Sequence, residues 1–421
     1  MFQRSRDGRV TRQGRGLLLG LTMTALLAAA SGALAQDAPP PPETKPEPKP
    51  WMEIYGFAML DIGENFTRID PDWYDTMRVS KLPAFDKEHG EDGDFFGSVR
   101  QTRFGVKTGF PTKLGELKTQ FEFELFGTGV DAGQTTFRLR HAYGELGAVG
   151  AGQYWSPFMD IDVFPNSLEY WGPTGMVFFR NVQVRWMPIK GDTRLTFAIE
   201  RPGASADQGV YADRIELSDI KARFPMPDVS GEYRMGGGWG YVEVAGILRY
   251  IEWDDFVDDQ YDLSGDTTGW GVNLSSNLKA GPRSTIRLQL MFGEGVENYM
   301  NDAPVDIGIQ NNFSNPRTPI LGKPLPIVGI VAFLDHNWND RWSSAIGYSR
   351  TDIDNTDGQE PEAYKTGQYA LGNVLFSPVP NMMVGGELQW GRRENFDDGF
   401  SSDGFKVQFS FKYNFSHRFG G

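Results

Sequence analysis

Nine basic side chains stand at alternating positions in segments whose pattern is typical of β-strands. They are Arg103, Lys107, Arg138, Arg140, Arg185, Arg194, Arg287, Lys406 and Lys412. Residues two apart in a strand point to the same face, so Arg138 and Arg140 would project together. Fixed positive charge on the wall of a narrow aqueous channel raises the local anion concentration. We therefore predict that these residues line a pore and favour small anions.

Several carboxylates share the same predicted face as the basic residues. They are Glu116, Glu122, Glu124, Glu200, Glu243 and Glu387. Part of the basic set would then be held in structural ion pairs, and the remaining positive charge would set the preference of the pore.

The segment 156–179 reads SPFMDIDVFPNSLEYWGPTGMVFF, which is too apolar for a loop that stays in water. We predict that it folds into a barrel, with Phe158 packed against the inner wall. Asp160, Asp162 and Glu169 would then face the basic residues across a constriction. Opposite charges that face each other at such a site create an electric field across the channel. The alternative is a surface loop in trimer contacts, with its acids solvated.

Little in the sequence points to catalysis. The four histidines are His89, His141, His336 and His417, and none stands beside a Ser and an Asp as a nucleophilic triad would. The alternation places His141 on the lipid-facing side of its strand. HExxH, Walker and dinucleotide-binding patterns are missing, and the acidic run 254–262 lacks an EF-hand pattern. We predict no enzyme activity, no cofactor and no metal site.

The elements that would position these side chains are short segments of strict alternation. In residues 115–126, Leu117, Phe121 and Leu125 share one face, whereas Glu116 and Glu122 share the other. Residues 182–186 and 286–292 alternate in the same way. A strand that crosses a membrane in a barrel faces lipid with one side and water with the other. A large soluble β-sandwich also alternates, because one face of each sheet is solvated.

Aromatic residues and loop lengths favour the barrel over the sandwich. Aromatic residues mark strand ends, where a membrane barrel has its interfacial girdles, at Trp51, Tyr55, Trp155, Trp186, Trp239, Trp270, Trp342 and Trp390. Seven short links occur at 111–114, 147, 188–192, 236–240, 280–283, 338–341 and 377–381. Eight long polar segments lie between them, around 62–98, 127–134, 156–179, 202–227, 253–267, 295–326, 352–366 and 394–402.

This asymmetry predicts an all-β fold, a transmembrane antiparallel β-barrel of about sixteen strands. The turns would be periplasmic and the long loops extracellular. The last strand, 404–415, carries Phe405, Phe409, Phe411 and Phe415 on one face, as the C-terminal strands of outer-membrane barrels do. The chain departs from the usual pattern because it continues to Gly421 instead of stopping at an aromatic residue.

The N-terminal region predicts export. Five arginines precede an apolar run over 17–30, and Ala33 and Ala35 follow it in the spacing of a signal-peptidase site. We predict a signal peptide over 1–35, a Pro-rich periplasmic linker over 36–50 and the barrel over 51–421. The alternative for the linker is a role in binding peptidoglycan or a partner.

Composition limits the partners and the source of stability. Removing residues 1–35 takes away five Arg and one Asp from 41 basic and 55 acidic residues. The remaining chain has 36 basic and 54 acidic side chains, a formal charge of −18. We therefore predict no nucleic-acid partner. Cysteine is absent, so disulfides do not stabilise the fold.

Four motifs together resemble the DcaP-like family of trimeric outer-membrane porins. They are VRQTRFG at 99–105, GELKTQFEF at 115–123, TFRLRHAY at 136–143 and GQYWSPFMD at 152–160. The resemblance implies a sixteen-stranded trimer that passes dicarboxylates, aromatic diacids and other small anions by diffusion. It also implies that Arg103, Arg138, Arg140 and Arg185 select the solute. Family members can carry an N-terminal coiled coil, whereas this chain has only the Pro-rich segment.

We therefore predict a passive anion-preferring porin in the outer membrane of a Gram-negative bacterium. Its partners would be outer-membrane lipid, lipopolysaccharide, small anionic solutes and two further copies of the chain. Two alternatives remain open at this stage. One is a barrel enzyme of the phospholipase or protease type, and the other is a plugged structural or adhesive barrel.

Overall fold

A computed structural model describes residues 49–421, so the predicted signal peptide and most of the predicted linker lie outside the described residues. The strands are β1 (Trp51–Asn65), β2 (Asp94–Ser98), β3 (Arg103–Thr112), β4 (Gly115–Phe126), β5 (Thr135–Leu146), β6 (Val149–Trp155), β7 (Arg180–Ile189), β8 (Arg194–Glu200), β9 (Ile220–Arg223), β10 (Asp228–Gly237), β11 (Gly240–Asp255), β12 (Gly265–Lys279), β13 (Ser284–Glu294), β14 (Ile307–Asn311), β15 (Ile320–Pro324), β16 (Pro326–Asn337), β17 (Trp342–Ile353), β18 (Tyr364–Phe376), β19 (Met382–Asn395) and β20 (Ser401–Gly420).

Short 3-10 helices interrupt the long loops. They are η1 (Pro71–Trp73), η2 (Val79–Lys81), η3 (Gly129–Asp131), η4 (Ile161–Val163), η5 (Gly209–Tyr211), η6 (Ile215–Leu217) and η7 (Glu297–Tyr299). Within residues 49–421, no helix has the length and apolar character needed to cross a membrane.

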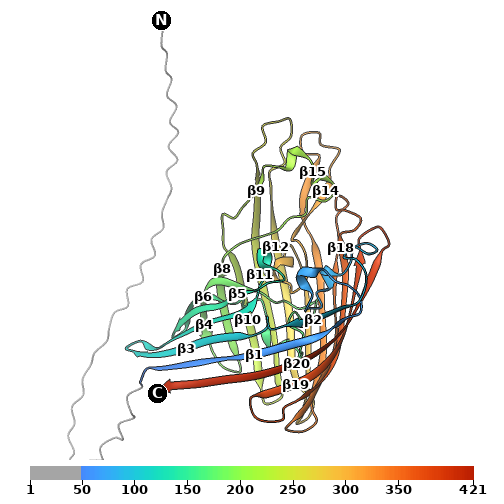
Figure 1. The fold of residues 1–421 in the computed structure, drawn as a ribbon. Helices are drawn as coiled ribbons and strands as arrows, with labels where there is room; N and C mark the ends of the chain where they lie inside the picture. Colours follow the sequence, from blue (N-terminus) through green and yellow to red (C-terminus); the bar gives the residue numbers. More distant parts are fainter. Residues whose placement is uncertain (1–48) are drawn as a thin grey trace, which may run out of the picture. The chain divides into compact units, whose positions relative to one another are not determined.

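Antiparallel neighbours pair in sequence order, and β20 pairs with β1 from Trp51↔Gly420 to Asn65↔Lys406, which closes the barrel (Figure 1). Among the twenty strands of the described region, β14 and β15 form a separate hairpin. β2 and β3 pair with successive parts of β1, and β9 pairs only with the upper end of β11. The remaining topology is a barrel of sixteen crossings, which confirms the predicted fold class.

The predicted alternation of short turns and long loops is confirmed. β3 and β4, for example, meet in a tight hairpin at Thr112↔Gly115, whereas 28 residues separate β1 from β2. Along β13 the outward Leu288 and Leu290 are 38% and 41% exposed, whereas the inward Gln289 and Met291 are 3% and 0% exposed. The outward side chains therefore form the apolar surface that lipid requires.

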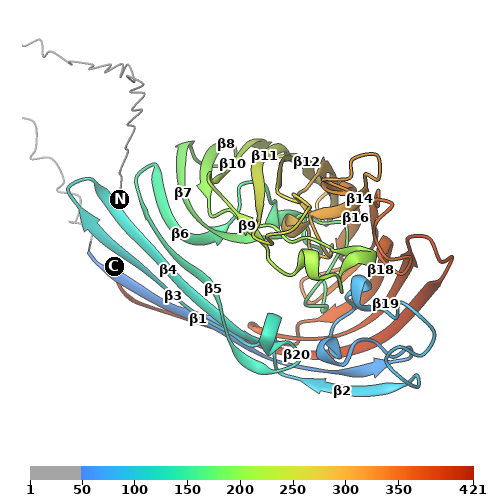
Figure 2. The same cartoon turned by 90° about the horizontal axis from the view of Figure 1, so that it is seen from above.

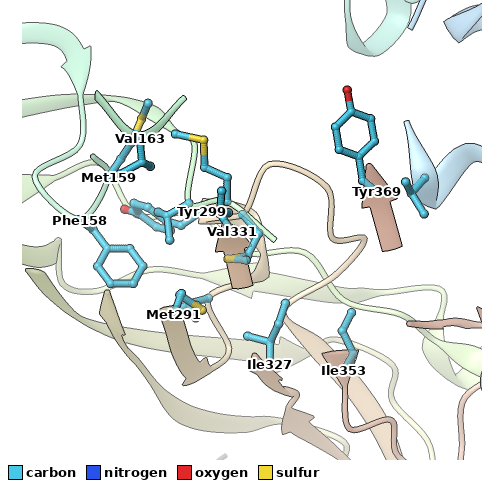
Figure 3. Packing of buried hydrophobic residues seen from close by; sticks show 14 of the residues in the cluster. Phe158, Met159, Val163, Met291, Tyr299, Ile327, Val331, Ile353 and Tyr369 are labelled. Carbon is cyan, nitrogen blue, oxygen red and sulfur yellow. The ribbon is translucent and has the colours of Figure 1, made fainter. Parts of the chain in front are cut away.

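Parts of three long loops fold into the barrel and pack against one side of its wall. They are L1 (66–93), L3 (156–179) and L6 (295–325). Their buried residues include Met77, Val79, Leu82, Phe158, Met159, Val163, Met176, Tyr299 and Met300, and they join Ile247, Met291, Ile327, Val331, Phe333, Ile353 and Tyr369 from the wall (Figure 3). The predicted inward fold of the third loop is confirmed, because Phe158 is fully buried.

This core explains why the inner face is apolar along part of the wall. In β16 the inward Ile327, Val331 and Phe333 are buried, while Val328 and Ile330 face outward. A strand that faces lipid on one side and the loop core on the other is apolar on both faces, so it lacks the apolar–polar alternation of a strand that faces water on one side. The open part of the lumen is therefore confined to the side of the barrel that the loop core leaves free.

The predicted lipid-facing position of His141 is wrong. The β4–β5 register runs Glu122↔His141 and then Phe123↔Leu139, so Arg140 is an extra residue in a β-bulge. A bulge lets two consecutive side chains share a face. Arg140 and His141 are accordingly both buried, and the His141 ring lies 4.7 Å from the Tyr154 ring and 4.9 Å from the Trp155 ring between centroids.

The last strand is longer than the predicted range 404–415. β20 continues to Gly420 because residues 416–420 pair with residues 51–55 of β1. The strand consequently includes Phe419, close to the C-terminal residue.

Candidate functional site

A cavity of about 640 Å³ remains in the part of the lumen that the loop core does not fill. Its wall includes β3, β5 and β7, and its other sides come from L1, L3 and L6. Six basic residues line it: Arg78, Arg103, Arg138, Arg140, Arg180 and Lys412. We call this space the cationic cavity.

Register places most of these arginines around one buried carboxylate. Glu124 of β4 lies opposite Arg103 of β3 and opposite Arg138 of β5. Its Oε2 accepts hydrogen bonds from Arg140 Nη1 at 2.6 Å and from Arg103 Nη2 at 3.2 Å. Its Oε1 lies 3.8 Å from Arg138 Nη1 and 3.9 Å from Arg180 Nη2.

Glu122 supplies the second carboxylate of the same cluster. Its Oε1 accepts from Arg140 Nε at 2.7 Å, and its Oε2 accepts from the Tyr55 hydroxyl at 2.7 Å. The four guanidinium groups of Arg103, Arg138, Arg140 and Arg180 therefore face two carboxylates, which leaves a net formal charge of +2. Arg103 and Arg138 keep 25% and 29% of their side chains exposed, so both can still contact a solute.

L3 brings an aromatic side chain to this cluster. The hydroxyl of Tyr170 donates to Glu124, and its ring stacks on Phe126 with centroids 3.8 Å apart. Burial raises the pKa of the Tyr170 hydroxyl, and the adjacent Glu124 carboxylate raises it further. Tyr170 therefore remains a neutral donor at physiological pH.

L1 adds an arginine that packs against two indole rings, which also contact each other. The guanidinium carbon of Arg78 lies 4.3 Å from the centroid of Trp73 and 4.4 Å from that of Trp171. Its Nε donates to Asp302 of L6 at 3.0 Å. Planar guanidinium and indole groups thus line the cavity side by side, which suits flat anions.

The acids of L3 are paired with inner-wall residues. Asp160 accepts from Arg234 Nη2 at 2.6 Å, from the Tyr241 hydroxyl at 2.7 Å and from Ser275 at 2.6 Å. Asp162 accepts from Arg234 Nη1 at 2.6 Å. These contacts fix the start of L3 against β10, β11 and β12.

The later part of L3 is held at the opposite side of the barrel. Glu169 pairs with Lys406 at 2.8 Å, and both side chains are fully buried. The carboxylate of Glu387 accepts the backbone N–H groups of Leu168 at 2.8 Å and Glu169 at 2.9 Å. L3 is therefore anchored at both ends, which sets the width of the cavity.

The structure brings together four of the nine basic residues chosen from sequence: Arg103, Arg138, Arg140 and Lys412 all line the cavity, where Lys412 lies 4.0 Å above the Phe57 ring. The other five lie elsewhere and have other contacts. Lys107 stands over Tyr55, Arg185 contacts Gln183 and the rings of Tyr143 and Tyr154, Arg194 pairs with Glu232 and Glu243, Arg287 pairs with Asp335, and Lys406 pairs with Glu169.

Three arginines that line the cavity or hold its loops were not predicted from the sequence. Alternation along β7 would place Arg180 on the lipid-facing side, together with Val182 and Val184. Arg180 is the first residue of β7, directly after L3, and it does not follow this alternation. Arg78 belongs to L1, an irregular loop in which side chains do not alternate between two faces. Arg234 does alternate with the outward Tyr233 and Met235, so its position on the inner face could have been found.

Comparison with solved structures shows the same fold. The chain is similar to the outer membrane channel DcaP of Acinetobacter baumannii, with a TM-score of 0.72 and 20% identity over 87% of this chain and 98% of that chain. It is also similar to the trimer form of OmpT from Vibrio cholerae, with a TM-score of 0.52 and 12% identity over 87% and 100% of the two chains. The anion-selective porin from Comamonas acidovorans gives a TM-score of 0.51 and 10% identity over 87% and 98%.

Sequence comparison points the same way. The chain is 27% identical to Porin Omp2b of Brucella suis biovar 1 (strain 1330) over 278 residues, which are 61% of this chain and 72% of that protein. Residues 84–303 match the model of the family described as DcaP outer membrane protein. That match includes β3 to β7 and L3, which supply much of the lining of the cationic cavity. The chain therefore belongs to the DcaP outer membrane protein family and forms a channel in the outer membrane of a Gram-negative bacterium.

Proposed function

We propose that the channel is a passive diffusion pore that favours small anions, dicarboxylates among them, and that it has no enzymatic activity. The observation that carries the proposal is the excess of four guanidinium groups over two carboxylates in the cationic cavity. Fixed charge in a confined space lowers the barrier for the opposite ion and raises it for ions of the same sign.

The geometry supports dicarboxylates within the class of anions. Guanidinium groups bind carboxylates through two parallel hydrogen bonds, and here several of them lie within one cavity. Arg138 comes from β5 of the barrel wall and Arg78 from L1, so a solute with two carboxylates could meet an arginine with each. Trp171 and Tyr170 are also among the lining residues, and their rings would offer flat surfaces to an aromatic diacid.

Two features of the whole protein belong to the same proposal. We infer that the channel works as a homotrimer, as the trimeric form of the Vibrio cholerae relative suggests. Residues 1–35 would direct export and residues 36–50 would form a periplasmic linker. Outer-membrane lipid and lipopolysaccharide would surround the barrel.

Ion selectivity in a planar bilayer tests the proposal. The purified channel is placed in a salt gradient, and the reversal potential is compared with that of a variant with Arg138→Ala and Arg140→Ala. We expect the anion preference to fall in this variant. Arg317→Ala is the matched control, because Arg317 is 75% exposed in L6 and lies outside the cavity. An unchanged reversal potential in the double variant would mean that these arginines do not set the selectivity.

The same recordings, together with a hydrolysis assay, separate the other two functions. A plugged structural barrel would leave the bilayer closed, and a barrel enzyme would hydrolyse lipid or peptide added to the purified protein.

A further inference from the structure

Three of the four arginines around Glu124 are committed to hydrogen bonds within the protein. Arg140 and Arg103 donate to Glu124 at 2.6 and 3.2 Å. Arg138 donates to the hydroxyl oxygen of Tyr170 at 3.3 Å. Tyr170 in turn donates to Glu124, so both oxygens of this carboxylate already accept hydrogen bonds. Little of its charge is left for a fourth arginine.

Arg180, at the start of β7, is that fourth arginine. Its side chain is only 6% exposed, and within residues 49–421 its Nη1 has no hydrogen-bond partner. Glu124 Oε1 lies 3.9 Å from Nη2, which exceeds the length of a hydrogen bond. A buried charged donor without an acceptor costs free energy, and an anionic group that enters the cavity recovers it. Arg180 is among the residues that line the cavity, so a solute can supply that group.

The surroundings of Arg180 are apolar. Its guanidinium carbon lies 5.0 Å from the centroid of the Trp155 ring and 5.9 Å from that of Phe178. The Phe178 ring in turn contacts the Phe164 ring, with centroids 5.8 Å apart. Both phenylalanines line the cavity and are only partly buried. An unpartnered cation and open aromatic surface therefore lie side by side.

These rings belong to a larger apolar surface inside the lumen, which we call the apolar shelf. It comprises Ile161, Phe164, Phe178 and Phe179 of L3 with Met300 and Ala303 of L6, all of which line the cavity. All except Met300 are only partly buried. Seen from above, the loops inside the ring of strands gather toward β12 to β18, away from β3 to β7 (Figure 2). Apolar surface that stays open in a water-filled lumen favours a solute with an apolar body.

A dicarboxylate does not use this shelf well. Its second carboxylate would lose hydration against apolar side chains that offer it no donor. Dicarboxylates suit Arg138 and Arg78 instead, which lie on the wall and on L1. A solute that fits Arg180 and the shelf together has one carboxylate and a hydrocarbon body.

We propose that the cationic cavity contains a separate site for amphipathic monocarboxylates, in which Arg180 binds the carboxylate and the apolar shelf holds the hydrocarbon chain or ring. The inference rests on the anion preference proposed above and adds a second class of solute to the dicarboxylates. Passage of such solutes is saturable, because each one occupies the cavity while it is bound.

A series of linear carboxylates tests the shelf. Acetate, butanoate and hexanoate are added in turn to the purified channel in a planar bilayer, and the concentration that halves the ion current gives an apparent Kd. We expect the apparent Kd to fall by about twofold to fourfold for each added methylene that the shelf covers. Equal values for acetate and hexanoate would overturn the site.

Two charge-matched variants test the anchor. Arg180→Gln and Lys412→Gln each remove one cationic side chain from the lining of the cavity, but Lys412 lies over Phe57 and outside the apolar shelf. We expect Arg180→Gln to weaken hexanoate binding by about tenfold or more, the loss of a hydrogen-bonded charge. Lys412→Gln should weaken it far less. Equal losses in both variants would overturn Arg180 as the anchor.

Phe178→Ser tests the shelf beside the anchor. Adipate has the same number of carbons as hexanoate but a second carboxylate, so we expect the variant to weaken hexanoate binding more than adipate binding. Equal effects on the two solutes would overturn the shelf. A heat-dependent change in electrophoretic mobility verifies that the variant is folded, and the chain-length series needs no substitution.

The reversal potential separates this inference from the proposed function. A channel that prefers anions but binds hexanoate no better than acetate would overturn the monocarboxylate site alone. A channel that prefers cations would overturn the proposed function and the site together.

Discussion

Glu124 of β4 and Arg140 of β5 form a buried ion pair, with 2.6 Å between Oε2 and Nη1, at the centre of the cationic cavity. Arg140 points inward by alternation with Arg138, and the β-bulge at Arg140 lets the next residue, His141, share that inner face. The pair couples stability to selectivity, since the same carboxylate restrains four arginines.

Replacing this carboxylate should separate the two effects. In Glu124→Gln the arginines lose one of their two counter-charges, so we expect a stronger anion preference in the reversal potential. We also expect the free energy of unfolding to fall by roughly 3–5 kcal/mol, the cost of breaking a buried ion pair by removing one partner. Urea unfolding in lipid vesicles measures the loss. An unchanged anion preference would show that Glu124 does not neutralise the arginines that face the solute.

The contact between L1 and L6 should control the width of the cavity. Asp302 accepts from Arg78 Nε at 3.0 Å and from the backbone N–H of Ser80 at 2.8 Å. In Asp302→Ala these donors lose their partner, at a cost of about 1–3 kcal/mol. We expect larger single-channel conductance and faster protease cleavage within L1. Asp357→Ala is a control, because its carboxylate caps a backbone N–H of β14 outside the cavity. Equal conductance in both variants would contradict the role of this contact.

Arg234 should hold the first part of L3 in place. It donates to Asp160, Asp162 and Glu243, each at 2.6 Å. Arg234→Leu leaves these carboxylates facing one another without their shared cation, so we expect L3 to leave the wall. Conductance should then become noisy and the melting temperature should fall. A quiet channel of unchanged conductance would show that Phe158 and the rest of the loop core hold L3 without this arginine.

Glu297 of η7 should make stability depend on pH. Its carboxylate is fully buried and lies near Asp306, and burial, followed by the charge of Asp306, raises the pKa of Glu297 well above its ordinary value. A carboxyl whose pKa is raised in the folded state stabilises the fold fully below its ordinary pKa. This contribution is lost as the pH rises from that value toward the raised pKa of the folded protein.

Glu297→Gln removes the titrating group from this position. We expect the variant to be more stable than the parent protein at neutral pH and to lose less stability between acidic and neutral pH. Urea midpoints across that range check the result. Asp75 in L1 also has a pKa raised by burial, so part of the pH dependence of stability should remain in the variant. If the urea midpoint of the variant changed with pH as much as that of the parent protein does, the assignment to Glu297 would be contradicted.

The barrel was predictable because its signals are local and repeated. A residue that faces lipid is apolar and a residue that faces water is polar, which produces the alternation along β4 and β13. Short turns, such as that after Thr112, and the apolar composition of L3 are also visible in short stretches of sequence. The strand count and the inward fold of L3 could be inferred from these features.

The details of the site depend on contacts that leave no periodic signal. The bulge that turns His141 inward depends on the pairing between β4 and β5. Arg78 reaches the cavity because L1 folds inward and places it against Trp73 and Trp171. The five basic residues outside the cavity alternate as well as Arg103 and Arg138 do. Alternation assigns a face, but it does not tell which part of the lumen the loops fill.

The zero-current potential of the unmodified channel in a KCl gradient directly measures whether the pore prefers anions. Because four guanidinium groups face two carboxylates at the cavity, we predict a potential with the sign that chloride permeation gives. We also predict a smaller potential when Arg138 and Arg140 are replaced. A potential of the opposite sign, given by potassium permeation, would contradict the anion preference.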